Sequence, residues 1–308
     1  MAGCRGDGVT PELRGKLECA VMDATHADWE LVSSEPVAGG CIHEALCLIG
    51  EDANGAKKYF AKLAAIERLP MLAAEAEGLA ALRAAGAVPA PAVIAHGDDG
   101  ETAWLILEWL DLEALGPSSG AALGIALAMQ HRIAQGKFGW EKDNFIGASP
   151  QANGWSDDWL AFWRDRRVHA QLRMAMAKRY PSKMIDRGER LLVDCEAFFS
   201  THRPMPSLLH GDLWGGNASA LADGMPVVFD PAVYCGDREA DIAMTELFGG
   251  FPKDFHAAYR NAWPLDDGYS VRRDFYNLYH VLNHANLFAG GYVEQSLRSI
   301  ERLLSEIR

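Results

Sequence analysis

Apolar residues in the first hundred positions gather in short runs of the length that β-strands have. The runs EALCLIG (residues 44–50) and KKYFAKLA (57–64) flank the turn sequence Asp-Ala-Asn-Gly, and they therefore predict a β-hairpin. A further run, TAWLILEWL (102–110), predicts another strand. We therefore expect this part of the chain to be rich in β-structure.

One helix is predicted among these strands, in the stretch 69–91. Its leucines Leu72, Leu79 and Leu82 recur at helical spacing and form one apolar stripe. Pro70 suits the first turn of a helix, and Gly86 suits the position just after its last turn. The pattern predicts no other helix in the first hundred residues.

Helical spacing dominates after residue 118, apart from a loop-rich section at 137–156 and a strand–turn region at 208–230. The chain therefore predicts an α+β protein with two lobes. We expect a small β-rich lobe over residues 1–109 and a larger, mostly helical lobe over residues 110–308.

The net charge of −13 argues against a nucleic-acid partner, which needs a basic face for phosphates. The most apolar stretch, residues 121–129, is much shorter than a membrane span, and residues 1–20 show neither the apolar segment nor the cleavage signature of a secretory signal. The six cysteines show no C-x-x-C spacing, which favours reduced thiols. We therefore expect a cytoplasmic protein without a membrane partner, monomeric by default, with a dimer through exposed thiols as the alternative.

A lysine and a glutamate stand out in this apolar setting. Glu75 falls on the stripe of the predicted helix, where a carboxylate is costly unless it is paired or solvated at the edge. Its natural partner is Lys62, in the strand just before the helix. Protein kinases use such a pair to hold an ammonium against the α- and β-phosphates of ATP.

A second candidate ATP contact is the sequence Gly39-Gly40-Cys41, which precedes Lys62 in the chain. Consecutive amides of glycines can bind phosphate, although a pair of glycines between strands is more often only a turn. The Cys41 thiol would lie among these amides. Either its oxidation blocks ATP binding reversibly, or it is an inert loop cysteine.

The segment HGDLWGGN (residues 210–217) places Asp212 and Asn217 at the spacing of the kinase catalytic loop, H-R-D-x-x-x-x-N. In that chemistry the aspartate accepts the proton of the attacking hydroxyl and the asparagine binds Mg²⁺. Asp230, at the end of the strand PVVFD, supplies a further oxygen ligand for the metal. The alternative is that these side chains only stabilise a tight turn.

HGDLWGGN also resembles the catalytic loop of aminoglycoside-phosphotransferase-like and choline-kinase-like enzymes. The closer resemblance is to the fructosamine kinases (ketosamine-3-kinases). It is carried by FGWEKDNFIG (138–147), NGWSDDWLAFWRDRR (153–167), FDPAVYCGDREADIAMTELFGGF (229–251) and LNHANLFAGGY (282–292). The resemblance covers the chain after about residue 34, and one departure is a glycine where the family usually has serine, at Gly215 or Gly216.

The resemblance implies a protein-kinase-like bilobal fold and ATP- and Mg²⁺-dependent phosphorylation of the 3-hydroxyl of ketosamines. The acceptors would be fructosamines or ribulosamines, on small amines or on glycated protein lysines, and the product would decompose and release the amine (deglycation). Two alternatives stay open at this point. One is a kinase for an aminoglycoside or a choline-like acceptor, and the other is a non-catalytic nucleotide-binding protein that senses redox state or a metabolite.

The same resemblance assigns roles to residues of the ATP and metal sites. Asp212 would be the base, and Asn217 and Asp230 would bind Mg²⁺. Glu108 and Leu110 would occupy the hinge that bonds adenine through backbone groups.

Further residues would support the loop or contact the acceptor. Trp214 is expected either to wall the sugar pocket or to pack under the loop, and His284 either to reach the acceptor or to pack. Asp241 resembles the buried aspartate that braces the catalytic loop, and His210 is expected to support the same loop. Arg166 and Arg167 are expected to be surface charges, with contacts on the substrate side as the alternative.

Overall fold

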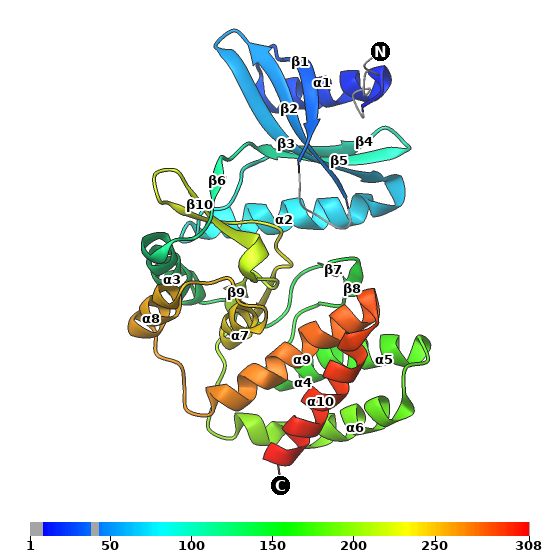
Figure 1. The fold of residues 1–308 in the computed structure, drawn as a ribbon, viewed down its shortest axis with the longest axis vertical. Coiled ribbons are helices and arrows are strands. Elements are labelled where there is room, and N and C mark those ends of the chain that lie inside the picture. Colours follow the sequence, from blue (N-terminus) through cyan, green and yellow to red (C-terminus); the bar gives the residue numbers. More distant parts are fainter. Residues whose placement is uncertain (1–8, 38–42, 308) are drawn as a thin grey trace. The chain divides into compact units, whose positions relative to one another are not determined.

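The computed structural model describes residues 9–37 and 43–307 (Figure 1). The chain divides into two compact units. The first runs to Ala84 and includes Ala90–Leu112, and the second consists of Ala85–Pro89 and Glu113 onward. Among the described residues, no helix has both the length and the apolar character needed to cross a bilayer.

The first unit is built on a five-stranded antiparallel sheet with the order β1-β2-β3-β5-β4. Its strands are β1 (Glu30–Pro36), β2 (Glu44–Asp52), β3 (Gly55–Ala65), β4 (Val93–Asp98) and β5 (Thr102–Glu108). The predicted hairpin is confirmed as β2 and β3, which pair from Glu44 opposite Leu63 to Asp52 opposite Gly55. Helix α2 (Leu69–Ala85) follows β3 after a short 3-10 turn (Ile66–Arg68). The predicted helix is therefore confirmed as well, and Gly86 after it has a φ of +72°.

The expectation of only one helix in this region is wrong, because α1 (Pro11–Thr25) precedes the sheet and packs on β1 and β4 (Figure 1). Its start follows known capping chemistry. The Thr10 hydroxyl accepts a hydrogen bond from the Leu13 amide, and Pro11 occupies the first turn. Leu13, Leu17 and Val21 recur every four residues and are buried against the sheet. The capping residues and the four-residue spacing of these apolar side chains could therefore have predicted α1 from the sequence.

The second unit is mostly helical. Its α-helices are α3 (Pro117–His131), α4 (Trp159–Trp163), α5 (His169–Ala177), α6 (Ser182–Asp194), α7 (Glu239–Leu247), α8 (Lys253–Ala262), α9 (Tyr269–Phe288) and α10 (Gly291–Glu306). Short strands form small antiparallel pairs between them: β7 (Asn144–Ile146) with β8 (Ser149–Gln151), β9 (Ser207–Leu209) with β12 (Tyr234–Gly236), and β10 (Ala218–Leu221) with β11 (Pro226–Val228). The two-residue β6 (Leu112–Glu113) lies at the boundary of the units.

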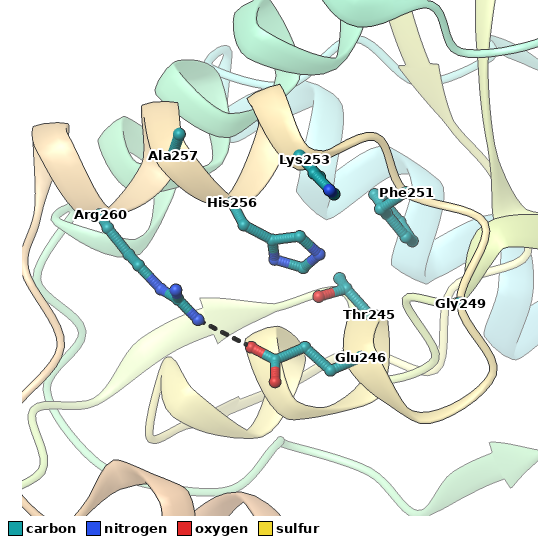
Figure 2. Close-up of a pocket in the computed structure, with 8 residues that line it drawn as sticks. All are labelled: Thr245, Glu246, Gly249, Phe251, Lys253, His256, Ala257 and Arg260. Carbon is teal, nitrogen blue, oxygen red and sulfur yellow. Dashed lines mark hydrogen bonds and ion pairs between the residues drawn. The ribbon is translucent and has the colours of Figure 1, made fainter.

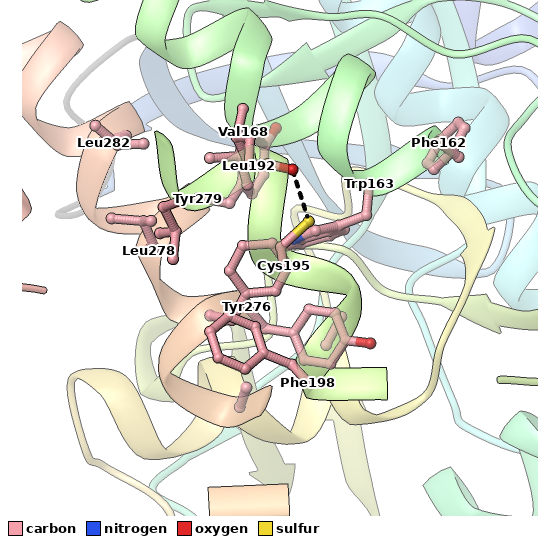
Figure 3. Close-up of a cluster of buried hydrophobic side chains, with 14 of the residues drawn as sticks. Phe162, Trp163, Val168, Leu192, Cys195, Phe198, Tyr276, Leu278, Tyr279 and Leu282 are labelled. Atoms are coloured by element: carbon pink, nitrogen blue, oxygen red, sulfur yellow. Dashed lines mark hydrogen bonds between the residues drawn. The ribbon is translucent and has the colours of Figure 1, made fainter. Parts of the chain in front are cut away.

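The core of the second unit surrounds helix α9, which packs against α5, α7 and α10. Figure 3 shows aromatic side chains of α4 and α9 beside residues that follow α6. Trp163 is fully buried and meets Tyr276 edge to face, with ring centroids 4.9 Å apart. This packing holds α9 in place, and α9 carries the predicted residue His284.

Arg167 is a correction to the sequence-based expectation, because it is buried rather than on the surface. Its guanidinium donates to the carbonyl of Ala152 and, at 2.7 Å, to Oδ1 of Asn153. The same group lies over the rings of Tyr234 (4.2 Å to the centroid) and Phe162 (4.6 Å). Its charge is therefore stabilised inside the unit by carbonyl dipoles and aromatic faces.

A buried ion pair joins the first turn of α7 to α9. Arg272 donates through Nε to Oε2 of Glu239 at 2.7 Å and through a terminal nitrogen to Oε1 at 3.0 Å. Both side chains are at most 1% exposed, so water could not solvate either charge if its partner were removed.

We predict that Arg272→Met lowers the free energy of unfolding by roughly 3–5 kcal/mol, because it leaves the Glu239 carboxylate buried without its partner. Urea unfolding followed by tryptophan fluorescence measures this loss. The double variant Arg272→Met/Glu239→Leu removes both charges and should recover much of the stability. An equal loss in the single and double variants would contradict this explanation.

Candidate active site

The lysine of the first unit is held as the sequence predicts. Lys62 lies in β3, opposite Ala45 of β2 and Leu105 of β5, so both of its neighbours in the sheet are strands. Its ammonium donates to Oε1 of Glu75 on α2 at 2.7 Å, and the two side chains are 9% and 12% exposed. The pair is thus largely shielded from water, which strengthens the attraction and restricts the ammonium to one position.

Other predicted ATP contacts in this unit have different outcomes. The amide of Glu108 donates to the carbonyl of Ala92 at 2.9 Å, and its carboxylate accepts from the amide of Ala92 at 2.7 Å. Those groups serve the β4–β5 end of the sheet, so an adenine contact by Glu108 would have to use its carbonyl oxygen. The backbone of Leu110 forms no hydrogen bond with the described residues. Gly39, Gly40 and Cys41 lie outside the described residues.

In the second unit, the segment after β9 is fixed by Asp241 of α7. Oδ2 of Asp241 accepts from the amide of His210 at 2.7 Å, and Oδ1 accepts from the amide of Gly211 at 2.9 Å. Asp241 is 1% exposed, and these bonds compensate the cost of burying its charge. Gly211 has a φ of +81°, and a Cβ there would collide with the carbonyl of Ala232. This explains why glycine stands where protein kinases have arginine.

Sequence reasoning missed the group that completes this brace, His131 at the end of α3. Its Nε2 lies 3.2 Å from Oδ2 of Asp241, and its Nδ1 lies 2.9 Å from the hydroxyl of Tyr259 on α8. A single histidine near a helix end gives no sequence signal for such a contact. The brace therefore links α3, α7 and α8 to the loop.

His210 is buried and also supports the loop, as expected. Its Nε2–H donates to the carbonyl of Phe229 at 3.0 Å, which leaves Nδ1 to accept from the amide of Asp212 at 3.3 Å. Burial lowers the pKa of this imidazole and keeps it neutral, despite the opposing charge of Asp241. One tautomer of His210 thus ties the loop to the end of the Asp230 strand.

The loop brings Asp212, Asn217 and Asp230 together. Nδ2 of Asn217 donates to the carbonyl of Asp212 at 2.9 Å, to its Oδ2 at 3.4 Å and to the carbonyl of Asp230 at 3.4 Å. Burial, with the charges of Asp230 and Asp241, raises the pKa of Asp212 to about 7. The three side chains predicted from sequence are therefore neighbours.

The donor set of this cluster fits a divalent cation. With Nδ2 of Asn217 directed to Asp212 and Asp230, Oδ1 of the same amide accepts no hydrogen bond within the described part of the chain. Carboxylate and amide oxygens are the ligands that Mg²⁺ prefers. The repulsion between the carboxylates of Asp212 and Asp230 is of the kind that a bound cation relieves.

The two predicted substrate residues are linked through a third aromatic side chain. Trp214 is 40% exposed and meets Phe248 edge to face, at 6.5 Å between ring centroids. Phe248 in turn contacts His284 of α9 at 4.9 Å. Trp214 is therefore not packed under the loop, and Phe248 is a residue that sequence reasoning missed. Phe248 could have been found from the sequence, because it directly follows α7 in the segment 229–251 that carries the family resemblance.

The two glycines after Trp214 are required by close contacts. A Cβ on Gly215 would lie 2.8 Å from the carbonyl oxygen of Gly249, and a Cβ on Gly216 would collide with the indole of Trp214. These contacts involve neither Asp212 nor the metal-binding candidates.

A separate cavity of about 480 Å³ lies between the end of α7 and helix α8 (Figure 2). Lys253, His256 and Arg260 line it from α8, and Arg260 pairs with Glu246 of α7 at 3.1 Å. Sequence reasoning predicted none of its lining residues as part of the site. Gly249, which contacts Gly215, belongs to its wall.

Comparison with known proteins identifies a kinase family, in agreement with the geometry of the site. The family model described as "Fructosamine kinase" matches residues 16–306, which extends the resemblance to include most of α1. A "Probable ketoamine kinase" of Vibrio cholerae is 41% identical over 280 residues, covering 90% of this chain and 94% of the relative. A chloroplastic "Protein-ribulosamine 3-kinase" of Oryza sativa subsp. indica is 35% identical over 278 residues, covering 88% and 79%.

A solved structure agrees with these sequence relatives. The crystal structure of a "Putative fructosamine-3-kinase" from Haemophilus somnus 129PT superposes with a TM-score of 0.84 at 29% identity. The match covers 94% of this chain and 96% of that one. The chain therefore belongs to the fructosamine kinase family and is an ATP-dependent kinase with a protein-kinase-like fold.

Proposed function

We propose that this protein transfers the γ-phosphoryl group of ATP to the 3-hydroxyl of a ketosamine, with Asp212 as the base. The observation that carries the proposal is the Asp212–Asn217–Asp230 cluster in a chain of the fructosamine kinase family. The names of the relatives from Vibrio cholerae and rice support ketosamines as the acceptors.

Asp212 has the properties of a general base in this reaction. Burial and the charges of Asp230 and Asp241 raise the pKa of Asp212, and a cation bound at Asp230 would lower it again, so Asp212 would be a carboxylate able to take the proton of the acceptor hydroxyl when Mg²⁺-ATP is bound. The hydrogen bonds from Asn217 orient this carboxylate. The position of this carboxylate is thus set before the substrates bind.

Asn217 and Asp230 would hold Mg²⁺, which neutralises charge on the phosphates of ATP when it is bound. Lys62, held by Glu75, would bind the α- and β-phosphates. Because the Lys62 ammonium is already oriented in the protein, little side-chain entropy is lost when the nucleotide binds.

Trp214 and His284 would bind the acceptor. An indole face suits both a sugar ring and the secondary ammonium that joins the sugar to its amine. His284 donates from Nδ1 to the carbonyl of His280 at 2.8 Å, and burial lowers its pKa. Its Nε2 is therefore an acceptor suited to a sugar hydroxyl or to the ammonium.

The product of this transfer is a ketosamine phosphoester. In the proposed sequence it decomposes and releases the original amine, which restores an unmodified amino group. On a protein lysine this would be deglycation. The enzyme's own chemistry ends at phosphoryl transfer.

The base assignment predicts that Asp212→Asn lowers kcat by roughly 10²–10⁴-fold, since an amide cannot accept the hydroxyl proton. ADP release measures this, with fructose-lysine, ribulose-lysine, kanamycin and choline as acceptors beside a blank without acceptor. Asp157→Asn is the matched control, because the Asp157 side chain is 81% exposed. Turnover with kanamycin or choline alone would overturn the substrate, and full activity of Asp212→Asn would overturn the base.

The metal assignment predicts that Asp230→Asn raises the Mg²⁺ concentration for half-maximal activity by at least about tenfold, because it removes the charged ligand. Titration of Mg²⁺ at saturating ATP measures this. Mn²⁺, which binds neutral oxygen and nitrogen ligands more tightly than Mg²⁺ does, should restore part of the rate. An unchanged Mg²⁺ requirement would contradict this role for Asp230.

A further inference from the structure

The backbone at Asp230 has an unusual conformation that neighbouring contacts must maintain. Its φ is +56°, in the left-handed region that residues other than glycine rarely adopt. Pro231, which follows directly, restricts this backbone further. Such a conformation persists only where the surrounding structure enforces it. The contacts of residues 231–234, which we call the post-aspartate segment, therefore decide how the Asp230 carboxylate is presented.

Two side-chain amides of the hairpin β7–β8 hold the post-aspartate segment. Nδ2 of Asn144, on β7, donates to the carbonyl of Val233 at 2.8 Å. Nε2 of Gln151, on β8, donates to the carbonyl of Ala232 at 3.2 Å and to Oδ1 of Asn144 at 2.8 Å. The backbone amide of Ala232 in turn donates to the carbonyl of His210 at 2.8 Å. The post-aspartate segment is thus bonded both to the hairpin and to the catalytic loop.

The orientation of these amides is fixed by the chemistry at each end of the hydrogen-bonded chain. Arg167 can only donate, and its guanidinium donates to Oδ1 of Asn153. Nδ2 of Asn153 therefore donates to Oδ1 of Asn144, at 2.8 Å. Nδ2 of Asn144 is left for the carbonyl of Val233, which can only accept. A chain of donors thus begins at the buried Arg167 and ends on the post-aspartate segment.

A second chain of donors starts from α9. The hydroxyl of Tyr279 donates to Oε1 of Gln151 at 2.8 Å, which directs Nε2 of Gln151 to the carbonyl of Ala232. Asn144, Gln151 and Tyr279 are at most 6% exposed, so water competes little for these hydrogen bonds. Because the two chains end on consecutive carbonyls, they restrict rotation of this backbone as well as its displacement.

We propose that Asn144 and Gln151, which we call the amide clamp, are positioning residues that hold the Asp230 carboxylate in the orientation that binds a divalent cation. This inference rests on the proposed function, in which Asp230 is a ligand of Mg²⁺. The amide clamp acts through the backbone of the post-aspartate segment, not by contact with the cation. Removal of a group that orients a metal ligand typically weakens metal binding by roughly 10–100-fold.

The alternative is that these amides stabilise only the fold of the second unit. Asn286 of α9 provides a comparison, because it is 2% exposed and its Nδ2 donates to the carbonyl of Gln171 at 3.0 Å and to its Oε1 at 2.8 Å. Both hydrogen bonds join α9 to α5, away from the post-aspartate segment. Asn286→Leu therefore measures the effect of losing buried amide bonds alone.

The test uses the full chain with the variants Gln151→Met and Asn144→Leu, beside Asn286→Leu as the matched control. Mn²⁺ is the probe, and electron paramagnetic resonance gives its Kd in the presence of a non-hydrolysable ATP analogue. ADP release with ribulose-lysine gives the Mg²⁺ concentration for half-maximal activity and, at saturating Mg²⁺, the KM for ATP. Thermal melting followed by circular dichroism gives the stability of each variant.

We expect both variants of the amide clamp to raise the Kd of Mn²⁺ and the half-maximal Mg²⁺ concentration by about tenfold. The KM for ATP at saturating Mg²⁺ should remain unchanged, because the Lys62–Glu75 pair is intact. Asn286→Leu should lower the melting temperature as the clamp variants do, since it also loses buried hydrogen bonds. It should leave both cation measurements unchanged.

An unchanged Kd of Mn²⁺ in Gln151→Met would overturn the inference, and so would an equal rise of that Kd in Asn286→Leu. Gln151→Met decides if Asn144→Leu does not fold, because methionine and glutamine have similar volumes. A wild type that binds no Mn²⁺ with the nucleotide would overturn both the inference and the metal assignment.

The proposed function fails separately, if the wild type binds Mn²⁺ and nucleotide but phosphorylates no ketosamine. Weaker Mn²⁺ binding by Gln151→Met would still support the amide clamp in that case.

Discussion

The carboxylate of Asp241 is the contact on which the rest of the catalytic segment depends. It is buried, and it accepts hydrogen bonds from two consecutive loop amides, with His131 beside it. A buried charge of this kind tolerates little movement of its donors, because each lost bond leaves part of the charge uncompensated. The loop therefore enters its turn in one conformation, and the positive φ of Gly211 is part of that conformation. Asp212 and Asn217 follow directly and inherit their positions from it.

The electrostatics of the site follow from the same arrangement. Asp212 is half-buried, and its partial removal from water together with the charges of the exposed Asp230 and the buried Asp241 raises its pKa. His210, which accepts a hydrogen bond from the amide of Asp212, is neutral and adds no positive charge to offset these carboxylates. Such an arrangement of carboxylates favours binding of a cation or a proton, and the proposed phosphoryl transfer would bring both to the site. In the first unit, the Lys62–Glu75 pair is similarly shielded from water, and in the proposed function its ammonium contacts anionic phosphates.

Much of the site could be predicted because kinase chemistry fixes residue types at short spacings. Asp212, Asn217 and Asp230 are such residues, and the strand lysine and its helix glutamate were recognisable by their order in the chain. Residues that act through tertiary contacts were not predictable in this way. His131 lies 110 residues from Asp241 in the chain, and Arg167 counts as a surface charge until its aromatic neighbours are known. The helix Pro11–Thr25 is a different case, since its cap and apolar spacing were visible and were overlooked.

The proposed reaction transfers phosphate to the 3-hydroxyl of a ketosamine. Phosphorus–proton correlation NMR of the reaction with ATP, Mg²⁺ and ribulose-lysine tests it most directly, because the coupling identifies the carbon that bears the phosphate. We expect a phosphate coupled to the proton on C3, followed by the appearance of free lysine as that signal decays. A phosphate on any other carbon, or a stable product that never releases lysine, would contradict it.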